Sequence, residues 1–113
     1  MSINALPPHA PPLKGPVFFE RREFERLLRL YGSMVAQGEW RDYAINADDE
    51  ACSFSVFRRA TEAPAYRIEK RPALAKRQGA WSVIGAGGLI VRRGHELEQV
   101  LKLFDSRKFR VVE

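Results

Sequence analysis

A chain of 113 residues, 45% hydrophobic and 29% charged with a net charge of +5, has the size of a single domain and is too apolar to be disordered. Its single cysteine, Cys52, excludes an internal disulfide and an all-cysteine zinc site, and it indicates a reducing compartment. We find no signal peptide and no apolar run of the roughly 18 residues that a membrane span needs, so we expect a soluble, cytoplasmic protein that does not enter a membrane.

The first 16 residues contain five of the seven prolines and few large apolar side chains. Proline lacks an amide donor and disfavours a helical conformation of the residue before it. We therefore expect residues 1–16 to form a disordered, proline-rich tail and residues 17–113 to form one domain.

The first helix is predicted over residues 21–37. Apolar side chains recur there at helical spacing and form one stripe, made of Phe24, Leu27, Leu28, Tyr31, Met34 and Val35. Glu20 is placed to cap this helix, with Glu23 at the third position of a capping box, and Gly38 provides a natural stop.

Five short strands are predicted next, over residues 40–45, 51–59, 65–71, 81–86 and 89–93. In the second strand Phe54 and Val56 face one way, and in the third Tyr66 and Ile68 alternate with charged residues. The short connection between these two strands predicts a hairpin, and Gly87-Gly88 predicts another between the last two.

A second helix is predicted over residues 94–105, with a buried stripe of Leu97, Val100, Leu101 and Phe104. Residues 109–112 are expected to add a last short strand or a docked tail. The order of elements predicts an α+β fold, in which an antiparallel sheet of four to six short strands carries both helices on one face. The other face of the sheet is then open to solvent or to a partner.

The positive charge is concentrated in residues 58–77, which hold seven Lys or Arg residues against two Glu. This asymmetry predicts an anionic partner such as nucleic acid, a phosphorylated ligand, a membrane surface or an acidic protein, and we favour nucleic acid or an acidic protein. The candidate nucleic-acid or anion-binding residues are Arg58, Arg59, Arg67, Lys70, Arg71, Lys76, Arg77 and Phe57. On the open face the arginines would neutralise phosphates while Phe57 stacks on a base. The alternative is a solvated face whose long side chains cover Phe57 and discourage edge pairing.

Other clusters carry weaker signals. The glycines of residues 85–88 lack the spacing of a phosphate-binding loop and favour a tight hairpin. His95 could act as a general base or bind a phosphate with Arg92 and Arg93, but we favour an exposed residue at a helix start. The acids of residues 48–50 favour a solvated turn, so the sequence predicts no metal site and no cofactor.

Long runs of this sequence are similar to one family: VFFERREFERLLRLYGSMVAQGEWRDYAI (residues 17–45), FSVFRR…YRIEKRP (54–72) and RQGAWSVIGAGGLIVRRGHEL (77–97). This is an uncharacterised family of small bacterial proteins, a domain of unknown function, and the resemblance covers residues 17–113. It implies a bacterial cytosolic protein, and it implies no particular activity, cofactor or catalytic residue.

The leading hypothesis is a non-enzymatic domain that binds nucleic acid or another polyanion through the basic sheet face. The second is a protein-interaction or assembly module that uses the open face or an edge strand, as a monomer or weak homodimer. An enzyme is the third, and it needs a concave site that collects Arg92, Arg93, His95 and Asp42.

Overall fold

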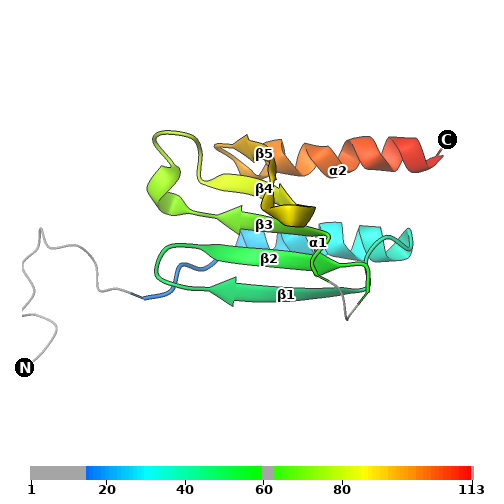
Figure 1. The fold of residues 1–113 in the computed structure, drawn as a ribbon, viewed down its shortest axis with the longest axis horizontal. Helices are drawn as coiled ribbons and strands as arrows, with labels where there is room; N and C mark the ends of the chain where they lie inside the picture. The colour runs from blue at the N-terminus through cyan, green and yellow to red at the C-terminus, as the bar shows by residue number, and fades with distance from the viewer. Residues whose placement is uncertain (1–14, 60–62, 113) are drawn as a thin grey trace, which may run out of the picture.

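Two helices and a five-stranded antiparallel sheet form the fold in the computed structural model, which describes residues 15–59 and 63–112 (Figure 1). The strands are β1 (Asp42–Ala47), β2 (Cys52–Phe57), β3 (Tyr66–Lys70), β4 (Trp81–Gly85) and β5 (Ile90–Gly94). The helices are α1 (Arg21–Ala36) and α2 (Leu97–Val112). This arrangement confirms the predicted α+β class. The predicted tail lies outside the described residues, except for Gly15 and Pro16.

Helix α1 begins and ends where the sequence places its caps. The Glu23 carboxylate accepts the amide of Glu20 at 2.7 Å, which is one half of the predicted capping box. Beyond the last turn Gly38 adopts a φ of +79°, a left-handed conformation that glycine enters without strain. The predicted apolar stripe is correct in outline, but Val35 is exposed and Leu30 is buried in the core instead.

The sheet is a meander, because the strand order β1-β2-β3-β4-β5 follows the order along the chain. Phe54 pairs with Ile68 and Ile68 pairs with Val83, so these three side chains lie side by side on one face. Ser55 pairs with Arg67 on the opposite face, as the predicted alternation requires. Strands β1 and β5 form the two edges of the sheet.

Both helices pack on the same face of the sheet, and one hydrophobic core lies between the two layers. Helix α1 contributes Leu27 and Met34, helix α2 contributes Val100 and Phe104, and all four side chains are almost completely buried. Full burial of such a side chain contributes about 1.5–3 kcal/mol each. The core therefore holds the helices in place and leaves the second face of the sheet uncovered by helices.

Two predicted boundaries are wrong. Trp40 does not begin a strand: it lies between α1 and β1, where its amide bonds to the carbonyl of Met34 in the last turn of α1. Its buried ring packs edge-on against Phe104, with the ring centroids 5.3 Å apart. Residues 109–112, expected to form a last short strand or a docked tail, instead continue α2, which ends at Val112. Residues 106–112 contain neither glycine nor proline that would end a helix.

The segment before α1 is fastened to the sheet. The ring of Phe19 stacks on Trp81, with centroids 6.0 Å apart and planes 7° from parallel. Lys70 on β3 donates to the carbonyl of Phe18 at 3.2 Å and to the Glu23 carboxylate at 2.7 Å. The start of α1 is thus held against β3 and β4 by a stacked ring pair and by one amino group.

Candidate functional site

The basic residues of the 58–77 segment divide between the two ends of the sheet. Strands β2 and β3 are antiparallel, with Cys52 opposite Lys70, so Arg58 follows β2 at one end and Arg71 follows β3 at the other. Strand β3 lies between these ends, and its five residues span about 17 Å. Arg59 lies next to Arg58, whereas Lys76 and Arg77 are exposed in the loop at the opposite end. The segment is continuous in sequence but does not form one patch.

Two of the predicted anion-binding residues are already engaged by carboxylates. Lys70 points to the helix-covered face, where it pairs with Glu23, and both side chains are largely buried. Arg71 pairs with Glu69 at 3.4 Å and with Glu50 at 3.2 Å. The hydrogen bond to Glu69 is the main reason that the pKa of Arg71 is raised, with a smaller contribution from Glu50. These partners reduce the positive charge that the two residues offer to an anion.

The open sheet face is more polar and less charged than the sequence suggests. Ser53, Ser55 and Ser82 are buried although neither α1 nor α2, the two α-helices of the described residues, covers this face. Phe57 is half-buried, and Arg67 is the basic residue that the face carries in the middle of β3. A stacking platform here would have one partly covered ring beside one central arginine.

The end of the sheet that carries Arg58 also carries an arginine that the predicted set omitted. Arg41, Arg58 and Arg59 line an open hollow of about 550 Å³ together with Gly38 and Glu39. Arg41 is the residue just before β1, and its amide bonds to the carbonyl of Phe57 at 2.7 Å. This bond places Arg41 beside the end of β2, which its position in the sequence does not reveal.

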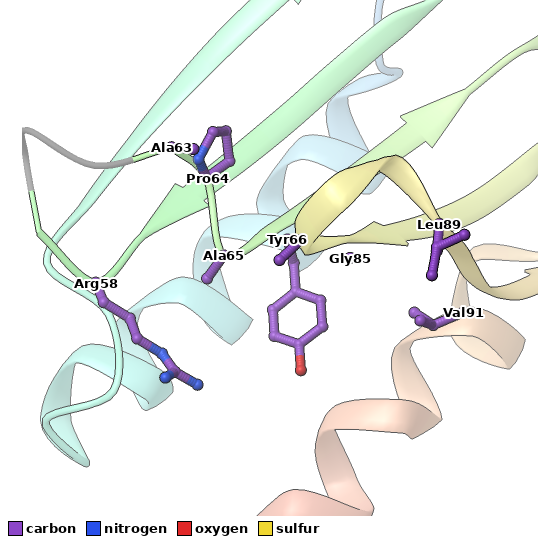
Figure 2. A pocket seen from close by; sticks show the side chains of 9 residues that line it. Arg58, Ala63, Pro64, Ala65, Tyr66, Gly85, Leu89 and Val91 are labelled. Carbon is purple, nitrogen blue, oxygen red and sulfur yellow. The ribbon is translucent and has the colours of Figure 1, made fainter.

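A second hollow of about 510 Å³ lies at the same end of the sheet (Figure 2). The ring of Tyr66 stands in its middle, Arg58 reaches in from one side, and Leu89 and Val91 form the other side (Figure 2). The floor includes the backbone near Gly85. Arg58 is exposed and has no ion-pair partner among the described residues. This hollow, called the end pocket below, combines apolar walls with one available cation.

The apolar wall of the end pocket continues along the edge of the sheet. Leu89, Ile90 and Val91 follow one another at the start of β5 and are 72%, 51% and 47% exposed. The pairing shifts register between Val83 and Ile84, which is a bulge in this edge strand. No strand of the described part of the chain pairs with the outer side of β5 (Figure 1). A run of exposed apolar side chains on an unpaired edge is a surface that native proteins normally protect.

The sequence pattern predicted a strand over residues 89–93 but did not predict that its apolar side chains would be exposed at an edge of the sheet. The sequence signal nearest to this surface is the pair of glycines before β5, Gly87 and Gly88, which both adopt positive φ values near 80°. Such a tight turn marks a hairpin, but an edge position depends on the topology of the whole sheet. The predicted hairpin between β4 and β5 is confirmed.

The structure also places Cys52 and the four groups of the enzyme hypothesis. Arg92, Arg93 and His95 line one hollow, whereas Asp42 lies on β1 at the opposite edge of the sheet. The four groups of the enzyme hypothesis are therefore not brought together. Cys52 is fully buried, and this burial raises the pKa of its thiol, so it is a poor nucleophile.

The acidic turn after β1 is structural. The Asp48 carboxylate accepts the amides of Glu50 and Ala51 at 2.8 and 2.9 Å, and these bonds lower the pKa of its carboxyl group. Within the described residues no group of three or more His, Cys, Asp or Glu is arranged to hold a metal ion. None of the helices described is both long and apolar enough to cross a membrane.

One of three comparisons with known proteins found a match. Searches against curated proteins and against solved structures found no match. Residues 17–101, most of the chain, match the profile of a family described as protein of unknown function (DUF2794). The chain belongs to this uncharacterised family.

Proposed function

We propose that the protein is a non-catalytic interaction domain that binds an extended segment of another protein along β5. The observation that carries this proposal is the run of Leu89, Ile90 and Val91, exposed on a strand with an unpaired outer side. An extended segment can add a strand to such an edge, where main-chain hydrogen bonds give affinity and side-chain pockets give specificity.

The end pocket supplies the specificity. Leu89 and Val91 offer an apolar wall to a side chain of the partner, and Arg58 offers a guanidinium to a carboxylate. Arginine binds carboxylates through two parallel hydrogen bonds, which orients the bound group. The partner segment is therefore an extended chain with apolar side chains and an acidic residue.

Selection from a random-peptide display library against the full-length chain tests this proposal. We expect enriched peptides to combine apolar and acidic residues, and to shift the amide resonances of residues 84–94 when titrated as synthetic peptides. The double substitution Leu89→Lys and Val91→Lys should weaken binding about tenfold or more, because it removes two apolar contacts.

Val35→Lys provides the control, since Val35 is an apolar residue of α1 that is 41% exposed, close to the 47% of Val91. This variant should bind like the wild type. Peptides that bind the β5 double variant as tightly as the wild type would exclude the edge as the binding surface.

A second candidate function is the binding of nucleic acid or another polyanion. The hollow shared by Arg41, Arg58 and Arg59 favours it, because three arginines line that hollow together with the single acid Glu39. Arg67 would add a further phosphate contact, and Phe57 a stacking surface. Lys76 and Arg77 lie at the opposite end of the sheet, so they would contribute only to a strand long enough to cross the open face. Lys70 and Arg71 would contribute less, because carboxylates already engage them.

Titration with a short mixed-sequence single-stranded oligonucleotide at several salt concentrations tests this candidate. If four or five phosphates are neutralised, the slope of log affinity against log salt should be about −3 to −4. Substituting Arg41 and Arg58 with Gln should flatten the slope. Affinity that does not respond to salt would rule out the polyanion function.

A further inference from the structure

A hollow of about 520 Å³ lies at the junction between β5 and α2, at the far end of β5 from the end pocket. Three segments build it: the loop after η2 (Pro72–Leu74, a turn of 3₁₀-helix), the end of β5, and the first turns of α2. Its size falls within the roughly 300–1,000 Å³ of small-molecule sites. None of the basic residues of the 58–77 segment lines it, whereas Arg92, Arg93 and His95, the phosphate alternative of the sequence analysis, all do.

The charge of this junction hollow is one-sided. Arg92, Arg93 and Lys102 line it, and no carboxylate is among its described lining residues. None of the three cations forms an ion pair in the described part of the chain. Glu98, an acid in the first turn of α2, is turned to Arg26 on α1, with 2.6 Å between Nε and Oε2. Three positive charges without a counter-charge favour an anionic ligand.

One neutral side chain of the hollow, Gln99, has a donor to spare. The Gln99 carboxamide oxygen accepts the amides of His95 and Glu96 at 2.9 and 3.1 Å, so its NH₂ group is left for another acceptor. The His95 Nδ1 atom lies 3.2 Å from the carbonyl oxygen of Ala75, a contact that requires a proton on Nδ1, so Nε2 of the neutral ring is an acceptor and offers no donor to an anion. Because the Gln99 oxygen already accepts two of the backbone amides at the start of α2, a ligand would bind to the side chains of the hollow and not to these amides.

The loop that closes the hollow is in tight contact with its opposite wall. Gly79 has a φ of +96°, and a Cβ atom at this position would lie 2.2 Å from the carbonyl oxygen of Gly94. Arg93 Nη1 also approaches the carbonyl of Gly79 at 3.5 Å. These contacts hold the loop against the end of β5, so the hollow is formed before a ligand arrives.

We propose that the junction hollow binds a small phosphate-bearing ligand through Arg92, Arg93 and Lys102, with Gln99 as an additional donor. Arginine guanidinium groups match the geometry of phosphate oxygens, and lysine adds a compact charge. A phosphoryl group with two negative charges uses three cations better than a single carboxylate does. This site is separate from the apolar half of β5 and does not depend on the proposed peptide binding.

Titration with inorganic pyrophosphate at constant ionic strength tests the proposal. We expect saturable amide shifts confined to residues 78–79, 92–96 and 99–102, and chloride at the same ionic strength should not reproduce them. The double substitution Arg93→Gln and Lys102→Gln should weaken binding about tenfold or more, because it removes two charge-assisted contacts.

The charge-matched control is Arg22→Gln with Arg29→Gln, which removes two exposed cations of α1. Pyrophosphate should bind this control variant as it binds the wild type. Equal losses in the two double variants would overturn the proposal, because they would indicate attraction by net charge alone. Binding of an oligonucleotide to these residues without binding of pyrophosphate would also overturn it.

Discussion

Replacing Phe104 with alanine is expected to lower the free energy of unfolding by about 3–5 kcal/mol. Phe104 is completely buried, and its ring packs edge-on against both Trp40 and Tyr66, with centroids 5.3 and 5.1 Å away. The substitution removes the contacts that join α2 to the α1–β1 link and to β3, and it leaves a cavity that rigid neighbours cannot fill. A loss of this size is a large fraction of the roughly 5–15 kcal/mol that a domain possesses.

Urea unfolding followed by tryptophan fluorescence measures this loss, and Trp40 reports directly because it contacts the deleted ring. Phe18→Ala is the matched control: Phe18 is 61% exposed, so the same truncation should cost about 0.5 kcal/mol or less. If Phe104→Ala does not fold, Phe104→Leu should fold with a smaller loss. A change below about 1 kcal/mol for Phe104→Ala would contradict the central position of this ring.

Gly79→Ala is the second substitution for which we expect a large effect. The new Cβ atom would lie 2.2 Å from the carbonyl oxygen of Gly94 and 2.9 Å from the amide nitrogen of His95, and the φ of +96° is unfavourable for alanine. The backbone conformation alone costs on the order of 1–2 kcal/mol. Because the clash is with backbone, which cannot rotate away as a side chain can, the total decrease in the free energy of unfolding should exceed this conformational cost.

Gly38→Ala separates the two contributions. Gly38 has a similar φ of +79°, but a Cβ atom there would meet nothing within 4 Å. Thermal unfolding of both variants should show a clearly larger decrease in melting temperature for Gly79→Ala. Equal decreases in melting temperature would mean that the loop after η2 is not in tight contact with Gly94. The loop would then not form a fixed wall of the junction hollow.

Local elements with strong chemical signals were predictable from the sequence. The Glu20 and Glu23 cap, the stop at Gly38 and the alternation in β2 and β3 depend on neighbouring residues alone. These signals were enough to predict the α+β class and the layer of two helices on one face of an antiparallel sheet.

Features that depend on the whole topology were not predictable in the same way. The charges of residues 58–77 looked like one patch, but the antiparallel pairing of β2 with β3 sends Arg58 and Arg71 to opposite ends. Trp40 resembled a strand residue, because a large aromatic residue fits a sheet edge as well as a core. Its place against Phe104 depends on how α2 crosses the sheet, which no local pattern encodes.

The candidate sites also depend on the topology of the whole fold. Arg41 joins Arg58 only because the start of β1 lies beside the end of β2. Arg93 and Lys102 face one hollow only because β5 leads directly into α2. The sequence named Arg92, Arg93 and His95 as a phosphate alternative, and these three residues line one hollow, while His95 is also exposed at the start of α2, as the preferred interpretation expected.

The meander also bears on how the chain reaches this structure. Every strand pairs with the strand that precedes or follows it in the sequence, so each hairpin can close over a short loop, without waiting for a distant segment. Topologies rich in local pairing fold faster than those that need distant segments to meet. During synthesis each strand would find its partner already emerged, while the stacking of Phe19 on Trp81 must wait until β4 is made.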